Sequence, residues 1–204
     1  MYFIKTPYLL KKVYPKRVWN KPTNEKKLYL TFDDGPHPSI TPFVLNLLKQ
    51  FDAFATFFCI GKNVLLYPEV FNQIKLNNHS VGNHTHNHLN GFKTKDKDYF
   101  DNIIEAKKHI TSNLFRPPYG RCTSFQAKFI QQQLNLQVIM WDVLSGDFDN
   151  NITPQHCAEN VLLHASAGSI IVFHDSEKAF DRLKIALPKT LTYFSQKGYS
   201  FSAL

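Results

Sequence analysis

The amino-acid sequence predicts an α/β fold, with a mostly parallel sheet surrounded by helices in a single domain. Short apolar runs rich in β-branched and aromatic residues alternate with segments of helical spacing along the chain. The run at 55–60 is largely apolar, which is typical of a strand covered on both faces. A length of 204 residues suits one α/β domain. These observations leave the sheet either open or closed as a barrel.

The expected elements follow one another as repeated strand–helix units. Because Ser and Thr favour helix starts and Pro is tolerated in a first turn, we expect helices to begin near Ser39 or Thr41 and at Thr153. Pro68 interrupts one helical pattern and predicts two short helices there. The predicted strands are 28–32, 55–60, 80–82, 114–115, 136–141, 168–173 and 199–201. The predicted helices are 41–50, 63–76 in two parts, 99–112, 124–133, 153–164 and 180–196.

The positive charge of the chain is concentrated at its N-terminus. The formal net charge is +8, but residues 1–30 hold eight basic side chains and one acidic one, and the rest holds sixteen and fifteen. Such an arm can touch nucleic acid or an anionic lipid surface. Apolar residues interleave with its charges, so we favour an arm at 1–27 that packs on a catalytic domain at 28–204. We therefore expect no nucleic-acid partner.

Targeting signals and cysteines indicate the expected location of the protein and the state of its thiols. No apolar stretch approaches the roughly 18 residues of a membrane span, and Lys5, Pro7 and Lys11 break up any signal-peptide core. The default expectation is a cytoplasmic location. The three cysteines are odd in number and widely spaced, so we expect reduced, structural thiols.

Polar motifs follow several of the predicted strands. Because the carboxyl ends of parallel strands meet at one edge, where barrels of this kind place their active site, these residues are expected to converge. The motifs are TFDDGP (31–36), HTHNH (84–88), RPPYG (116–120), WDVLSGDF (141–148) and IVFHD (171–175).

Two motifs supply metal ligands and a base. Asp33 and Asp34 leave a strand in different directions, so one carboxylate can bind a metal while the other accepts a proton. His84 and His88 are four residues apart and would face the same side of one helical turn. An Asp and two His leave open coordination positions, the pattern of a catalytic zinc site. The absence of Glu between the histidines disfavours a zincin protease.

The remaining motifs supply an acid and an oxyanion donor. Arg116 can orient a carboxylate, and the N–H of Tyr119, beyond two prolines, is available to an oxyanion. His174 is suited to donate a proton to a departing amine, and a carboxylate such as Asp147 would hold its tautomer and raise its pKa. Any one of these motifs alone could be an ordinary turn or strand end.

Taken together and in this order, the motifs resemble those of polysaccharide deacetylases of the NodB-homology type, carbohydrate esterase family four. The resemblance extends over roughly residues 28–201. It implies a distorted (β/α)7 TIM-like barrel that removes acetyl groups from N-acetylated, sometimes O-acetylated, sugars such as those of peptidoglycan or chitin. It also implies one divalent ion, foremost Zn²⁺, with Co²⁺ or Ni²⁺ as alternatives. The sequence does not fix the oligomeric state, and a monomer is the default expectation.

The resemblance also assigns roles. Asp34, His84 and His88 correspond to the metal ligands, and Asp33 corresponds to the catalytic base. The other correspondences are Arg116 as the partner of that base, Tyr119 as the oxyanion amide, Asp147 as the support of the acid and His174 as the acid.

Two motifs depart from the family pattern. Leu144 and Phe148 replace the usual Asp and Trp of the fourth motif, and Val172 replaces a Leu in the fifth. Phe148 and Val172 are expected to line the pocket for the acetyl methyl group. Two alternatives stay open: hydrolysis of another carbon–nitrogen bond on the same fold, and a non-catalytic module that binds an anionic polymer.

Overall fold

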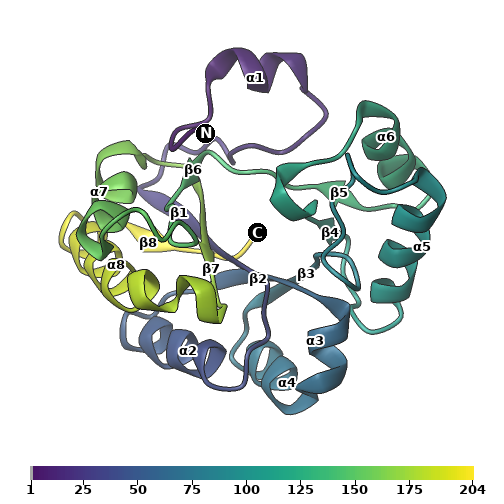
Figure 1. Cartoon of the computed structure of the whole chain (residues 1–204). Helices are drawn as coiled ribbons and strands as arrows, with labels where there is room; N and C mark the ends of the chain where they lie inside the picture. The colour runs from purple at the N-terminus through teal and green to yellow at the C-terminus, as the bar shows by residue number, and fades with distance from the viewer. Residues whose placement is uncertain (1) are drawn as a thin grey trace.

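The computed structural model describes residues 2–204 as a curled parallel sheet with helices around it (Figure 1). The sheet order is β5-β4-β3-β2-β1-β7-β6, with β8 paired to β1, and every strand pairing is parallel. The predicted α/β class and seven-stranded barrel-like sheet are confirmed. The strands are β1 (Lys27–Asp33), β2 (Ala55–Cys59), β3 (Ser80–Asn83), β4 (Leu114–Phe115), β5 (Gln137–Val138), β6 (Val143–Leu144), β7 (Ile170–His174) and β8 (Ser200–Phe201).

Aromatic side chains of β1, β2 and β7 pack between the sheet and the helices that cover it. Phe32 stacks on Phe57 and on Phe173, with ring centroids 5.0 and 6.1 Å apart. All three rings are fully buried. Rings of this size bury large apolar areas, so these three strands contribute strongly to the core.

The helices begin and end largely where local sequence signals place them. Pro68 separates α3 from α4, as predicted, and Thr153 caps α7 by accepting the N–H of His156. The helices covering the sheet are α2 (Ile40–Gln50), α3 (Gly61–Leu66), α4 (Pro68–Leu76), α5 (Asp96–Lys107), α6 (Ser124–Gln132), α7 (Pro154–His164) and α8 (Glu177–Gln196).

The N-terminal segment lies between the two outer strands of the curled sheet, with α1 (Tyr8–Val13) projecting beyond them (Figure 1). Before α1, Lys5 forms a bridge with Val143 of β6; after it, Val18 forms a bridge with Ile139 next to β5. Asp142 accepts hydrogen bonds from the ammonium groups of Lys5 and of Lys11. The segment thus hydrogen-bonds to both outer edges of the sheet. The division of the chain at residue 28 stays a prediction.

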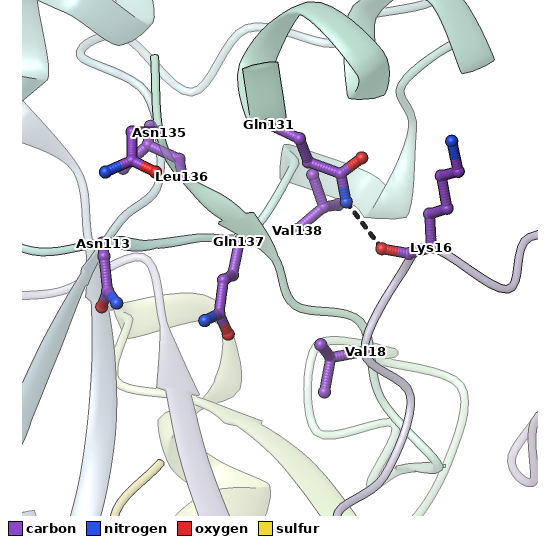
Figure 2. Close-up of a pocket in the computed structure, with 8 residues that line it drawn as sticks. All are labelled: Lys16, Val18, Asn113, Gln131, Asn135, Leu136, Gln137 and Val138. Atoms are coloured by element: carbon purple, nitrogen blue, oxygen red, sulfur yellow. Dashed lines mark hydrogen bonds between the residues drawn. The ribbon is translucent and has the colours of Figure 1, made fainter. Parts of the chain in front are cut away.

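Figure 2 shows where this segment passes β5. The side-chain amide of Gln131 donates to the carbonyl of Lys16 at 2.6 Å, and the N–H of Val18 donates to the carbonyl of Val138 at 2.9 Å. These residues line a cavity of about 240 Å³. This cavity is separate from the motif residues and has mainly amide and aliphatic walls.

Several predicted boundaries were wrong. The strand predicted at 136–141 pairs with β4 only at Gln137 and Val138, because Met140 then donates its N–H to Val18 of the N-terminal segment. The helix predicted at 99–112 covers Asp96–Lys107, where acidic residues in the first turn favour an earlier start. The elements α1 and β6 were not predicted.

Candidate active site

The strand register brings the ends of the motif-bearing strands to one edge of the sheet. Asp33, the last residue of β1, is in register with His174, the last residue of β7. Asn83, the last residue of β3, is in register with Phe115, and Arg116 follows directly. The expected convergence of the motifs is therefore a consequence of parallel pairing.

Three potential metal ligands meet just beyond this edge. One ligand atom each from Asp34, His84 and His88 lies within 4.8 Å of the others. Oδ1 of Asp34 is 3.1 Å from Nε2 of His88 and 3.6 Å from Nε2 of His84. The structure thus brings the predicted triad together.

His84 and His88 do not lie on a helical turn, and that prediction was wrong. β3 ends at Asn83, and a loop follows in which Thr85 and His88 have φ values of 63° and 56°. Asn83 Oδ1 accepts the N–H of Thr85, and Thr85 Oγ1 accepts the N–H of Leu89. The left-handed backbone folds the loop back on itself, so the two imidazole rings face one another with centroids 5.1 Å apart.

The donor set of this triad fits a divalent metal ion. His84 Nδ1 lies 2.8 Å from the carbonyl oxygen of Arg116, which can only accept, so the proton resides on Nδ1 and Nε2 keeps its lone pair. Burial lowers the pKa of His84 to about 4, which keeps its ring neutral. Oδ1 of Asp34 is buried and has no hydrogen-bond partner within residues 2–204. One carboxylate and two imidazoles are ligands typical of zinc and similar ions.

The Asp34 carboxylate is also held in its charged form. Burial opposes ionisation, but the nearby imidazoles of His88, His174 and His84 outweigh it and lower the pKa of Asp34 well below its ordinary value. A metal ligand must be deprotonated, so this environment prepares Asp34 to bind a cation.

Asp33 is held by a buried arginine. Nη1 of Arg116 donates to Asp33 Oδ1 at 2.7 Å and to Thr31 Oγ1 at 2.6 Å. Nη2 donates to the carbonyl of Met140 at 3.0 Å. Arg116 is fully buried, and Asp33 is only 3% exposed. The arginine therefore fixes one carboxylate oxygen of Asp33 and leaves the other facing the cavity.

His174 is paired with Asp147 in the way predicted. Oδ1 of Asp147 lies 2.7 Å from His174 Nδ1, and Oδ2 accepts the backbone N–H of His174, also at 2.7 Å. Burial disfavours the imidazolium, but the Asp147 charge and hydrogen bond, with Asp34 and Asp33 nearby, raise the pKa of His174 to about 10. The geometry leaves Nε2 as a protonated group.

The carboxyl group of Asp175 packs beneath the turn after β1, a role that was not predicted from the sequence. Asp175 lies against Gly35, where a Cβ atom would come within 2.1 Å of its carboxylate oxygen. Thr41 Oγ1 donates to the same carboxyl group. Burial raises the pKa of Asp175 to about 8. Only glycine leaves room for this carboxyl group beneath the turn.

Tyr119 lies on a short turn at the mouth, in a 3₁₀ segment covering Pro118–Gly120. Its φ of 60° turns the backbone sharply after the two prolines. Its N–H donates to no other backbone group within residues 2–204 and so is available. The Tyr119 hydroxyl lies 3.2 Å from Nδ1 of His88. Its position thus suits the predicted contribution to oxyanion binding.

These groups line a cavity of about 730 Å³. Phe148 packs edge-on against the His174 ring with centroids 5.3 Å apart, and Val172 and Leu144 form apolar wall beside it. Several further residues that were not predicted to belong to the site also line the cavity: Tyr2, Asn90, Phe92, Lys93, Arg121, Trp141 and Lys178. Arg121 directly follows the RPPYG motif, and that adjacency was a usable signal.

The cysteines and the helix lengths bear on two further expectations from the sequence. Cys59, Cys122 and Cys157 are buried and unpaired. No helix within residues 2–204 has the length and apolar character needed to cross a membrane.

At the mouth of this α/β barrel, an Asp–His–His cluster lies near a buried Asp–Arg pair and an Asp–His pair. This is the layout of a metal-assisted hydrolase. The profile of the polysaccharide deacetylase family matches residues 20–139, more than half of the chain. This chain belongs to that family, whose members are metal-dependent. The resemblance seen in the motifs is confirmed.

Individual relatives agree with this assignment. A peptidoglycan-N-acetylglucosamine deacetylase of Bacillus cereus is 34% identical over 90% of this chain and 88% of its own length. A chitooligosaccharide deacetylase of Azorhizobium caulinodans is 36% identical over 74% of this chain and 75% of its own. The crystal structure of a peptidoglycan N-acetylglucosamine deacetylase in complex with 4-naphthalen-1-yl-N-oxidanyl-benzamide matches with a TM-score of 0.88 and 30% identity, covering 98% of this chain and 95% of that one.

Proposed function

We propose that this polysaccharide deacetylase removes acetyl groups from N-acetylglucosamine residues of a glycan of the peptidoglycan or chitin type. The observation that carries the proposal is the common cavity shared by the Asp34–His84–His88 cluster, the Asp33–Arg116 pair and the Asp147–His174 pair. Amide hydrolysis by water needs an activated electrophile, a base and an acid, and these three groups supply one each.

In this proposal Asp34, His84 and His88 would hold one divalent ion, foremost Zn²⁺, which would polarise the acetamide carbonyl and lower the pKa of water. Co²⁺ and Ni²⁺ are the alternatives, because all three ions accept nitrogen and oxygen ligands.

The chain's own residues carry the proton transfers. Asp33, oriented by Arg116, accepts a proton from the attacking water. His174 donates its Nε2 proton to the sugar nitrogen as the carbon–nitrogen bond breaks, and Asp147 stabilises the imidazolium before that transfer. The Tyr119 N–H stabilises the negative charge that develops on the carbonyl oxygen, a contribution typically worth about 3 kcal/mol. Phe148, Val172 and Leu144 enclose the acetyl methyl group and exclude water from it.

Acetate release tests the proposal. The purified protein, stripped with a chelator and reloaded with Zn²⁺, Co²⁺ or Ni²⁺ in turn, is incubated with N-acetylglucosamine oligomers or peptidoglycan fragments. We expect acetate only after reloading, and Asp33→Asn and His174→Ala to lower kcat by about 10²–10⁴-fold with the fold intact. Absence of acetate, together with cleavage of another amide, would favour the alternative carbon–nitrogen hydrolase.

The metal assignment has a matched control in the same loop. His88→Gln should abolish stoichiometric metal binding, whereas His86→Gln should keep it, because the His86 ring packs near His109, with centroids 6.2 Å apart, and against Gly61. Metal content measured by atomic emission separates the two variants. Equal metal content would contradict the assignment.

A further inference from the structure

The rim of the active-site cavity holds three exposed cations with no carboxylate partner. Lys93, Arg121 and Lys178 all line the cavity and are exposed, and none forms an ion pair with another group among residues 2–204. The acidic residues that line the same cavity are Asp33 and Asp34, and both are engaged in its interior. The open part of the cavity therefore carries a net positive charge.

The three cations lie on both sides of the reacting centre. Lys93 belongs to the loop between β3 and α5, and Arg121 follows the Pro118–Gly120 turn after β4. Lys178 is in the first turn of α8, which follows β7. In the sheet, β3 and β4 lie on one side of β1, and β7 lies on the other. A glycan crossing the mouth with its acetamide at the centre would pass basic side chains in both directions.

Aromatic rings hold two of these cations at the rim. The guanidinium carbon of Arg121 lies 5.5 Å from the centroid of Phe92, and Nζ of Lys178 lies 5.9 Å from the centroid of Phe148. Phe92 and Tyr119 are 57% and 61% exposed, which suits rings that stack on sugars. Arg121 thus stands beside an exposed ring that a neighbouring sugar unit could cover, and Lys178 stands beside the ring at the wall of the acetyl pocket.

Nearby acidic groups do not neutralise this charge. Glu177, next to Lys178, lies 3.5 Å from Nε2 of His37 and points away from the cavity lining. Asp149 accepts a hydrogen bond from the hydroxyl of Tyr2 and does not line the cavity. The positive charge of the rim does not follow from the overall charge of the domain, because residues 31–204 carry sixteen basic and fifteen acidic side chains.

We propose that Lys93, Arg121 and Lys178 select a glycan that bears carboxylates on the sugars flanking the acetylated residue, over a neutral glycan of the same length. The inference rests on the proposed deacetylase function and names the substrate class for it. The lactyl carboxylates of alternating muramic acid units, and the carboxylates of peptides attached to them, have this chemistry, whereas chitin oligomers lack it. Electrostatic attraction of this kind acts mainly on capture of the substrate and weakens with salt.

The test compares two tetrasaccharides, one alternating N-acetylglucosamine with N-acetylmuramic acid and the other made only of N-acetylglucosamine. For the wild-type protein loaded with metal, we expect kcat/KM for the anionic glycan to exceed that for the neutral one by roughly tenfold at low salt. This preference should shrink as NaCl rises from 20 to 500 mM, and a methyl-esterified anionic tetrasaccharide should lose it.

Two triple variants sharpen the test. K93Q/R121Q/K178Q should bring the ratio of the two kcat/KM values close to one. K49Q/K75Q/K107Q removes the same charge from the last turns of α2, α4 and α5, at the opposite end of the barrel, and should keep the wild-type ratio. R121K, which retains charge but loses the planar stacking group, should keep most of the preference. Metal content and circular dichroism confirm that each variant is folded.

The outcomes separate the two proposals. Acetate release from both glycans with a ratio near one in the wild-type protein, or a ratio unchanged in K93Q/R121Q/K178Q, would overturn this inference and leave the deacetylase function standing. An equal loss of ratio in the control variant would overturn it as well, since a general charge effect would then suffice. No acetate from either glycan would overturn both.

Discussion

Two parts of the sheet hold the active site by different means. β1, β2 and β7 have seven, five and five residues, and they present Asp33 and His174 at paired strand ends. β4, β5 and β6 have two residues each, and their site residues, Arg116, Tyr119 and Asp147, lie in the loops that follow. The long strands position their residues by register, whereas the short strands depend on side-chain hydrogen bonds and turns with positive φ.

Arg116 joins these two parts across the interior of the sheet. It donates to Thr31 and Asp33 of β1 and to the carbonyl groups of Ile139 and Met140, which follow β5. Its side chain is therefore both the partner of the proposed base and a tie between the long-strand and short-strand parts.

Replacing this arginine should have the largest effect on stability. Arg116→Met should lower the free energy of unfolding by about 3–5 kcal/mol, because it leaves the buried Asp33 carboxylate without its partner. Urea denaturation of the apoprotein measures the change. Arg121→Met, at an exposed position three residues beyond the two prolines, should change it by no more than about 0.5 kcal/mol. A similar small change for both variants would show that the two parts of the sheet do not depend on Arg116.

The same contrast explains what could be predicted from the sequence. Strands β1, β2 and β7 were found because their apolar runs are long, and the residues after them follow from register. β6 was missed because Val143 and Leu144 lie inside a motif that was interpreted as a loop, whereas the equally short β4 was predicted from its place before Arg116. The approach of His84 to His88 was expected, but for the wrong reason, since the positive φ of Thr85 has no signature in a non-glycine residue. Asp175 and the cations of the rim are defined only by packing between segments distant in the sequence.

The Asp147–His174 pair connects the two parts, because Asp147 lies in the loop after β6 and His174 is the last residue of β7. Asp147→Asn should lower kcat by about 100-fold, roughly 2.7 kcal/mol, because the imidazolium loses its charged partner. The alkaline limb of the pH–rate profile should also move to lower pH, since the carboxylate raises the pKa of His174 to about 10. Asp149→Asn, in the same loop, is the control, and a profile shifted equally in both variants would contradict the assigned pairing.

The same pair should also appear in the pH dependence of stability. A histidine whose folded pKa is raised stabilises the folded protein fully below its unfolded value near 6.5, and this stabilisation is lost as pH rises towards about 10. The melting temperature of the metal-free protein should therefore fall between pH 7 and 10, and fall less in Asp147→Asn.

His79 lies at the opposite end of the long strands, far from the metal ligands, and its protonation should change the stability of the protein. Its Nδ1 accepts the N–H of Ala55 at the start of β2, and burial lowers the pKa of His79 to about 4. Because the unfolded state then binds the proton more tightly, stability should be lost as pH falls from about 6.5 to 4. At pH 4.5 this loss is on the order of 2 kcal/mol by linkage. His79→Gln should remove that part of the acid-induced loss, and His156→Gln, at an exposed position, should not.

The smallest effect concerns how the connecting helices begin. In the short-strand part, α6 links β4 to β5 and starts with a capping box, in which Thr123 accepts the N–H of Gln126 and the Gln126 side chain accepts the N–H of Thr123. In the long-strand part, α2 links β1 to β2, and the side chain of Ser39 makes no capping hydrogen bond within the described chain. Thr123→Ala should therefore cost about 1 kcal/mol of unfolding free energy, and Ser39→Ala close to nothing.

If short strands depend on their helices for position, amide hydrogen exchange in β4 and β5 should become faster in Thr123→Ala. In Ser39→Ala, β1 and β2 should exchange at unchanged rates. Equal protection of all four strands in both variants would mean that the helix caps do not help to hold the short strands in place.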